Sequence, residues 1–163
     1  MRSTTPEWDD YATGQAEAYL KRVRDLHHRR ASLAAQVEEA RDMLDGIKAV
    51  RYDGQGGGGS NDPDGAMLPA IARLEASVKR FGAGIAEIAD LFAEATDAIA
   101  RLDDDVFREL LTVYYVQGET WQAVADSLGY GVDNVYKLRT RALLAFYDVM
   151  PHGERDPRHP AEI

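Results

Sequence analysis

The sequence predicts an all-α protein, in which a long antiparallel helical hairpin of the coiled-coil type precedes a C-terminal domain of shorter helices. Apolar residues recur at spacings of three and four through residues 14–51 and 66–102, which is the periodicity of helices with one buried face. A glycine-rich segment, 53–65, separates these stretches. From residue 103 the pattern changes to shorter apolar runs divided by glycines.

Residues 14–51 are rich in Ala, Glu, Leu, Arg and Gln, which all favour helix. Their apolar stripe has one polar interruption, at Arg30. We expect residues 1–13 to form a flexible N-terminus, although Trp8 and Tyr11 could fold back onto a neighbour. The stripe consists of Leu20, Val23, Leu26, Leu33, Val37, Ala40, Leu44 and Ile47.

The helix predicted over 66–102 has the more regular stripe. Spacings of four and three alternate, and the average period of about 3.5 is typical of a left-handed coiled-coil seam. Gly82 and Gly84 weaken this helix locally and would allow a partner helix to approach closely. The stripe consists of Met67, Ile71, Leu74, Val78, Phe81, Ile85, Ile88, Phe92, Ala95, Ile99 and Leu102.

Segment 53–65 is predicted to be a loop, because glycine is costly to order and Pro63 lacks an amide donor. Such a loop would let the two helices bury their stripes against each other within one chain. The same stripes would also suit pairing with another copy of the protein, and the sequence does not choose between these arrangements.

The small domain is predicted over 103–150 and opens with three consecutive aspartates, Asp103–Asp105. Carboxylates at the start of a helix interact favourably with its dipole, so we interpret them as a cap and not as an acid–base or metal site. The helix is predicted to stop at Gln117-Gly118. Its apolar face consists of Val106, Phe107, Leu110, Leu111, Tyr114 and Tyr115.

Two further helices with a tight turn between them are predicted next. Thr120 is a favourable N-cap for a helix from Trp121 to Ser127. A helix-turn-helix requires a small residue where its helices cross, and Ala125 stands there. The turn requires a positive φ, which Gly129 supplies. Apolar residues predicted to fill the angle between the helices are Val124, Leu128, Tyr130, Val135 and Leu138.

Residues 103–146 resemble region 4 of the sigma-70 family, whose pattern joins an apolar helix, a Gly-x-[Ser/Thr]-aromatic step, Ala, Leu-Gly and a late Arg-Ala-Leu. The matching residues are Phe107 to Tyr115, Gly118 to Trp121, Ala125, Leu128-Gly129 and Arg141 to Leu143. The arrangement of long helices, glycine-rich loop and this module is also similar to small phage-encoded sigma-region-4-like proteins. Some relatives of those proteins are regarded as activators of late phage genes.

Two residues depart from the family pattern. Gly131 stands where the family usually has a capping Ser or Thr, a difference of a few tenths of a kcal/mol. Asp133, near the start of the next helix, would repel phosphate but could accept a hydrogen bond from a cytosine amino group.

The resemblance implies that a recognition helix from Val132 to Phe146 enters the major groove of double-stranded DNA. We expect Asn134 and Lys137 to reach base edges. Side chains suited to phosphate contacts are those of Thr120, Gln122, Arg139 and Arg141. The inward-facing residues are predicted to be Val135, Leu138, Ala142 and Leu143. The outward-facing residues on the reading side are predicted to be Val132, Asp133, Tyr136, Lys137 and Thr140.

The charge of the chain argues for weak DNA binding. The 163 residues carry a net charge of −9, whereas a general nucleic-acid binder needs a basic footprint. Between Glu119 and Tyr147 three acids balance three bases. The acids are Glu119, Asp126 and Asp133, and the bases are Lys137, Arg139 and Arg141. We therefore expect only weak binding by this chain alone.

Several classes of protein are not expected. The absence of cysteine suits a reducing cytoplasm, and the resemblance to phage-encoded proteins implies that of a bacterial host cell. The sequence has no apolar run of the kind that would predict a signal peptide or a membrane span. His27 and His28 are adjacent on a helix and point apart, and His152 and His159 lie in a tail, 151–163, that we expect to be disordered. We predict no enzymatic activity, cofactor or metal.

The sequence is best interpreted as a DNA-binding transcription regulator, phage or prophage encoded, that contacts promoter DNA, RNA polymerase or both. The coiled coil would make it a homodimer or dock it to a partner. One alternative is a DNA-packaging recognition subunit like a phage small terminase, which would form a ring of many copies. Another is an interaction protein whose helix-turn-helix does not bind DNA.

Overall fold

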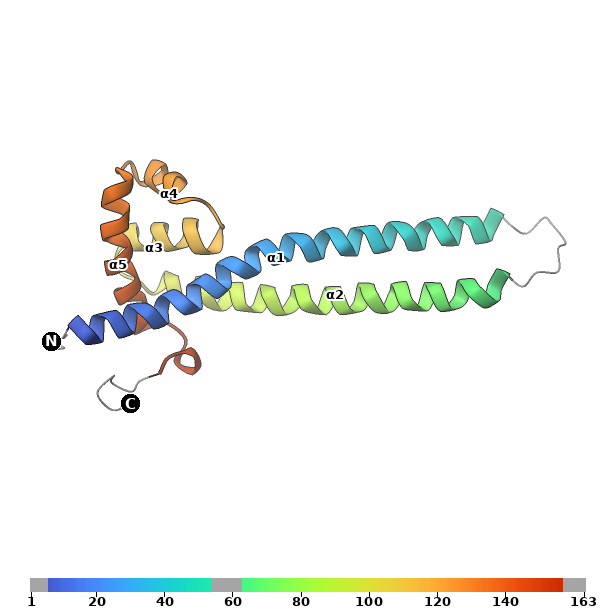
Figure 1. Ribbon diagram of the computed structural model, residues 1–163, viewed down its shortest axis with the longest axis horizontal. Coiled ribbons are helices and arrows are strands. Elements are labelled where there is room, and N and C mark those ends of the chain that lie inside the picture. Colours follow the sequence, from blue (N-terminus) through green and yellow to red (C-terminus); the bar gives the residue numbers. More distant parts are fainter. Residues whose placement is uncertain (1–5, 54–62, 157–163) are drawn as a thin grey trace. The chain divides into compact units, whose positions relative to one another are not determined.

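The computed structural model describes residues 6–53 and 63–156, and every element in these ranges is helical (Figure 1). This confirms the all-α class for the described residues. None of the described helices is long and apolar enough to cross a membrane. The elements are α1 (Pro6–Asp53), α2 (Pro63–Ala100), α3 (Asp105–Leu111), the π-helix η1 (Thr112–Val116), α4 (Trp121–Leu128), α5 (Val132–Val149) and the 3-10 helix η2 (His152–Glu154).

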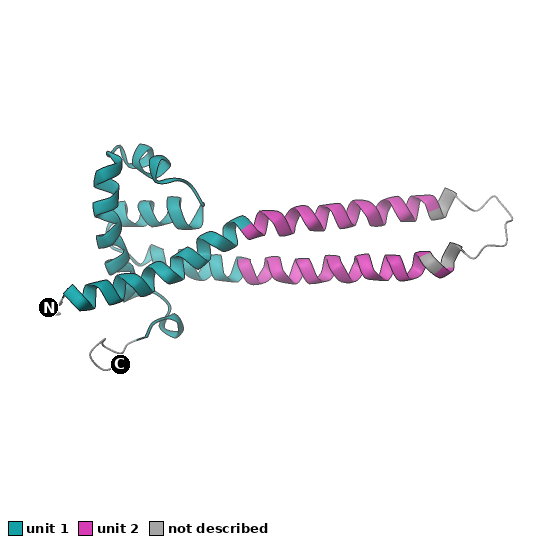
Figure 2. Ribbon diagram, in the orientation of Figure 1, with its two compact units in different colours: residues 1–28, 89–163 teal, residues 29–88 magenta. Residues whose placement is uncertain are grey.

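The chain divides into two compact units (Figure 2). Unit 1 contains residues 1–28 and 89–163, and unit 2 contains residues 29–88. The predicted boundary at residue 103 is therefore wrong, because the first half of α1 and the end of α2 belong with α3–α5. A helical stripe shows which face is buried, but it does not show which neighbour buries it.

Unit 2 consists of the second half of α1 and most of α2, whose ribbons lie side by side in opposite directions (Figure 2). Val37, Ala40 and Leu44 are buried there without a second copy of the chain. A methyl group at Gly84 would lie 3.5 Å from Leu33 Cδ1, whereas Gly82 has open space around it. Gly84 is thus the glycine that faces the other helix. The predicted loop lies mostly outside the described residues.

Helix α1 begins at Pro6, well before the predicted start at residue 14. The interpretation of residues 1–13 as flexible is wrong for residues 6–13, and residues 1–5 lie outside the described ranges. Proline is favourable in the first turn of a helix, where its missing amide hydrogen costs nothing. Ala12 is fully buried, and the Trp8 ring meets the Tyr147 ring edge-on, with 5.5 Å between centroids. Packing against α5 therefore orders this segment.

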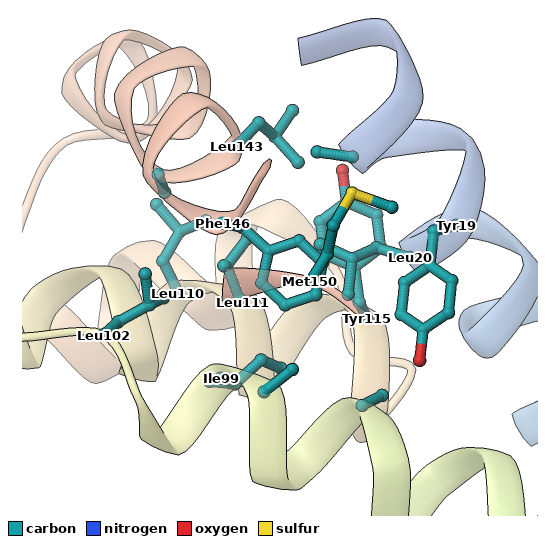
Figure 3. Close-up of a cluster of buried hydrophobic side chains, with 14 of the residues drawn as sticks. Tyr19, Leu20, Ile99, Leu102, Leu110, Leu111, Tyr115, Leu143, Phe146 and Met150 are labelled. Carbon is teal, nitrogen blue, oxygen red and sulfur yellow. The ribbon is translucent and has the colours of Figure 1, made fainter. Parts of the chain in front are cut away.

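The core of unit 1 collects buried side chains from α1, α2, α3, η1 and α5 (Figure 3). Leu20, Leu110, Leu111 and Phe146 are fully buried. Each such side chain contributes about 1.5–3 kcal/mol when it is removed from water. Because Leu20 comes from α1, the small C-terminal helices share their core with the N-terminal half of that helix.

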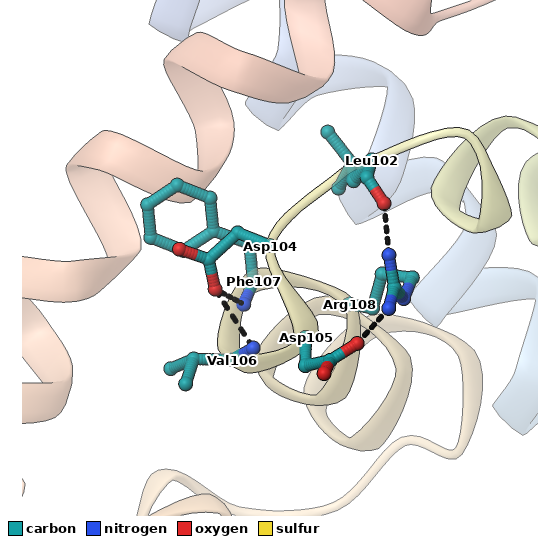
Figure 4. Close-up of polar contacts among 6 residues, drawn as sticks. All are labelled: Leu102, Asp104, Asp105, Val106, Phe107 and Arg108. Atoms are coloured by element: carbon teal, nitrogen blue, oxygen red, sulfur yellow. Dashed lines mark hydrogen bonds and ion pairs between the residues drawn. The ribbon is translucent and has the colours of Figure 1, made fainter.

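The start of α3 has the cap that its aspartates predicted (Figure 4). Asp104 Oδ1 accepts hydrogen bonds from the amides of Val106, at 2.8 Å, and Phe107, at 3.2 Å. Arg108 forms an ion pair with Asp105 and donates a hydrogen bond to the carbonyl of Leu102. Asp104 is therefore the aspartate that caps α3. Asp105 holds the side chain of Arg108, which closes the turn before the helix by its hydrogen bond to Leu102.

The tail prediction is wrong for residues 151–156, which are ordered against unit 1. The Asp156 amide donates to Gln15 Oε1 at 2.8 Å, and its carbonyl accepts from Tyr147 Oη at 3.0 Å. Arg22 and Glu154 form an ion pair of 2.8 Å. Side chains of α1 thus hold this segment, whose one regular element is the short 3-10 helix η2. The remainder of the predicted tail lies outside the described residues.

We predict that Asp104→Ala lowers the free energy of unfolding by about 1 kcal/mol, because it leaves two amides of α3 without an acceptor. The control is Asp103→Ala, which removes the same charge from the exposed neighbour and should change stability by no more than about 0.5 kcal/mol. Urea unfolding followed by circular dichroism measures both values. Equal losses would show that charge, and not capping, accounts for the effect.

Candidate nucleic-acid interface

Helix α4 is the first helix of the predicted pair and begins as expected. Thr120 has extended backbone angles, and its Oγ1 accepts a hydrogen bond from the amide of Ala123 at 3.1 Å. Val124 and Ala125 are buried. Gln122 is on the exposed side, where its Nε2 donates to Asp126 Oδ1 at 2.9 Å. The small residue at position 125 therefore lies inside the domain, as a helix crossing requires.

The turn between α4 and α5 depends on Gly129, whose φ is +70°. The amide of Tyr130 then donates to the carbonyl of Ala125 at 3.0 Å and closes the end of α4. Gly131 precedes α5 without a side-chain cap. Tyr130 was predicted to fill the angle between the helices, but its side chain is 42% exposed. It follows the left-handed residue and belongs to neither helix, so Val135 and other apolar residues fill the angle.

Helix α5 has one buried and one exposed side. Val135 and Ala142 are fully buried, and Leu143 is almost so, as predicted. The exposed candidates are Asp133, Asn134, Tyr136, Lys137, Thr140 and Arg141. Val132 was also expected to face outward, but it is half-buried against the core. The reason is its spacing, since residues three apart on a helix lie on the same side and Val132 shares the inward side of Val135.

Arg139 was predicted to contact phosphate, but it is bound within the protein instead. Its guanidinium forms an ion pair with Glu17 of α1, and the guanidinium carbon lies 5.5 Å from the centre of the Trp121 ring. Arg139 comes four residues after Val135, so it emerges on the same side of α5. Only Lys137 and Arg141 remain as exposed cations on this helix.

A cluster of aromatic rings supports the start of α4. Tyr114 stacks on Trp121, with 3.6 Å between centroids and 13° between planes. The guanidinium carbon of Arg24 lies 4.0 Å from the centre of the Tyr114 ring. Arg24 Nη1 also donates to the carbonyls of Tyr114 and Glu119, the latter at 2.7 Å. The first half of α1 therefore fixes the loop that carries the Thr120 cap.

Sequence reasoning missed Glu17 and Arg24. Both are polar residues of the long helix α1, and they lie outside the apolar stripe from which its buried face was predicted. Their partners are 122 positions away for Glu17 and 90 or more for Arg24. Nothing local distinguishes them from solvated charges, so only the fold could reveal their contacts.

The charges of the region do not form a basic footprint. Between residues 119 and 149 the chain has four acidic and three basic side chains, and Glu17 pairs with one of the bases, Arg139. Lys137 and Arg141 are four residues apart and so lie next to each other on the exposed side. The acidic residues are Glu119, Asp126, Asp133 and Asp148. This surface can contact few phosphates.

No protein-family model matches the chain, and neither a curated protein nor a solved structure is significantly similar to it. Within the described ranges, no three His, Asp or Glu side chains come together as ligands for a metal ion.

We predict that Arg139→Ala lowers the free energy of unfolding by about 1–2 kcal/mol, because it removes the Glu17 pair and the packing on Trp121. Arg141→Ala is the matched control, because it removes the same group from the exposed side, and it should stay within about 0.5 kcal/mol of the parent. Chemical denaturation measures both. If the two variants were destabilised equally, Arg139 would be a surface residue after all.

We predict that Gly129→Ala lowers the free energy of unfolding by about 1–2 kcal/mol, because an alanine is strained at a φ of +70°. Gly118→Ala should cost distinctly more. Its φ is +72°, and a methyl group there would also lie 2.6 Å from the His27 ring of α1. Urea unfolding ranks the two variants. The opposite ranking would mean that His27 moves aside at little cost.

Proposed function

We propose that this chain is a sequence-specific DNA-binding transcription regulator. In this proposal α3–α5 form a sigma-region-4-like helix-turn-helix domain, and α1 and α2 form an antiparallel coiled-coil hairpin. The observation that supports it most is the geometry of α4 and α5. They meet through a left-handed glycine and a buried alanine, Gly129 and Ala125. A helix presented in this way can enter a major groove.

The exposed side of α5 has the chemistry for reading base pairs. Asn134 can donate to and accept from an adenine edge, and Lys137 can donate to guanine. Both are exposed and lie in the first two turns of α5. Arg141 is one turn further along and suits a phosphate contact. Thr120 and Gln122 lie at the start of α4. In this proposal the Thr120 cap presents that end of the helix to the same DNA.

The small number of exposed cations on α5 determines how the domain would act on DNA in this proposal. Affinity for DNA grows with the number of phosphates that a protein neutralises, and on α5 Lys137 and Arg141 are the cations available for this. We therefore propose that the module acts at promoters together with RNA polymerase, whose own contacts with DNA would supply most of the affinity. The module would contribute sequence preference, as the resemblance to sigma region 4 implies.

A second candidate is an interaction protein that contacts a protein partner and no DNA. The balance of charge favours it, because Glu119, Asp126 and Asp133 lie on or beside the two helices that would have to approach phosphate. Acidic side chains close to a DNA backbone would repel it.

We predict that the double change Lys137→Ala and Arg141→Ala strongly weakens binding to a cognate DNA fragment. The slope of log affinity against log salt should become shallower by about 0.9 for every phosphate that the variant no longer neutralises. The fragment comes from selection of bound sequences from a random pool, with and without RNA polymerase. Fluorescence anisotropy on the selected fragment measures affinity for the parent and the variant.

The matched control is Arg73→Ala with Lys79→Ala, which removes two exposed cations from unit 2. It should bind the fragment as the parent does. Equal weakening by both double variants would reduce the effect to net charge and refute the assignment of α5. Failure of any sequence to be enriched, with or without polymerase, would favour the interaction protein.

A further inference from the structure

The helical seam of unit 2 is only partly covered. Of the apolar stripe of α2 in this unit, Ile88 alone is buried, and the residues before it are half-buried. A helix depends for most of its stability on the packing of its apolar face, and a single neighbouring helix covers that face from one direction only. The half-buried residues are Met67, Ile71, Leu74, Val78, Phe81 and Ile85.

One side of this seam, which we call the open face, also exposes two large apolar side chains. Met43 is 50% exposed and Val50 is 60% exposed. They are seven residues apart and stand at position g of the α1 heptads. In an antiparallel pair the g positions of both helices flank the same side of the seam. On α2 these positions are held by the small residues Ala70, Ser77 and Gly84.

The two helices of unit 2 carry opposite charge. Between residues 36 and 47, α1 has four acidic side chains and one basic one, whereas α2 has three basic and one acidic between residues 70 and 81. All nine are exposed, and no two of them form an ion pair with each other within the chain. They are Glu38, Glu39, Arg41, Asp42 and Asp45 on α1, and Arg73, Glu75, Lys79 and Arg80 on α2.

The acidic and basic stretches lie at the same level of the hairpin. Gly84 faces Leu33 across the seam, and the helices run in opposite directions (Figure 2). Counting from that contact places Glu39 within one turn of the level of Arg80. Residues four apart lie on the same side of a helix. Glu39 precedes Met43 by four and Arg80 precedes Gly84 by four, so both charges border the open face.

We propose that a second copy of this chain covers the open face, so that two hairpins form a four-helix bundle. The charges select the arrangement. Packing α1 on the partner's α1 would bring acidic side chains together, whereas packing α1 on the partner's α2 brings acidic side chains to basic ones. The two hairpins then point in the same direction about a two-fold axis, and Glu39 of each copy meets Arg80 of the partner.

The open face is large enough for a stable dimer. Residues 29–53 of α1 extend about 37 Å at about 1.5 Å per residue, and two helices side by side are about 20 Å wide. The resulting area of about 700 Å² per copy is close to the roughly 800 Å² that each partner buries in a standard specific interface. The dimer involves unit 2 alone, so it stands independently of the proposed DNA binding.

Analytical ultracentrifugation of the full chain, without DNA, tests the surface. The parent is expected to be a dimer at about 100 μM, and Met43→Lys should weaken self-association about tenfold or more, because a symmetric interface contains the change twice. Leu68→Lys is the matched control. Leu68 is 51% exposed but stands at position e, on the other side of the seam, so its variant should dimerise as the parent does. Circular dichroism checks that both variants keep the parent's helix content.

A parent that stays monomeric at this concentration, or that forms a ring of many copies, overturns the proposal. Dissociation caused by Leu68→Lys and not by Met43→Lys also overturns it, because the partner would then lie on the opposite side of the seam.

Charge reversal tests the arrangement of the two copies. Glu39→Arg and Arg80→Glu should each weaken self-association, because each places like charges opposite one another across the interface. Mixed together, the two single variants should form a heterodimer with the affinity of the parent. Each chain then supplies the charge that the other needs, while the charges within either chain still repel.

Glu38→Arg makes the same change one residue away, outside the open face, and should dimerise as the parent does. If the mixture associates no better than the single variants alone, α1 does not pack on the partner's α2 and the proposed arrangement is wrong.

Discussion

The packing of the first half of α1 against α5 is the interaction on which the small C-terminal helices depend. Leu20 and Val23 are fully buried in the same core as Phe146, and Tyr19 stacks on Phe146 with 5.9 Å between centroids. Helices α3–α5 alone form a chain segment close to the size below which a single core is rarely sufficient. The first half of α1 and the end of α2 complete this core. The structural module is therefore unit 1 as a whole.

The local features of this module follow from local sequence signals. Thr120, Gly129 and the aspartates Asp103–Asp105 were predicted from the residue types that a cap or a tight turn requires. Thr120 and Gly129 have these roles in the structure, and among the aspartates Asp104 is the cap. Such features depend on a few neighbouring residues, because a hydroxyl or carboxylate reaches only the next amides and a positive φ concerns one residue. A sequence pattern is sufficient to find them.

The long-range features could not be predicted in the same way. The stripe on α1 resumes after its one polar interruption at Arg30, yet its first half packs on α3–α5 and its second half lies in unit 2. Arg139 was assigned to DNA because its charge suited phosphate, but its side chain meets Glu17, 122 positions away. The ordered residues 151–156 likewise depend on Gln15 and Arg22. Helical periodicity contains no information about which distant residue completes a contact.

The π-helix η1 has a consequence for how this module tolerates change in length. Its turns are closed by bonds such as that from the Gln117 amide to the Thr112 carbonyl, at 2.9 Å, so it holds one residue more than an α-helical turn. That residue lets Tyr115 enter the core while Tyr114 stacks on Trp121. Deleting one residue here would restore a regular helix and rotate the two tyrosines out of their places. Insertions and deletions in this short segment should therefore be rarer among natural variants than substitutions that keep its length.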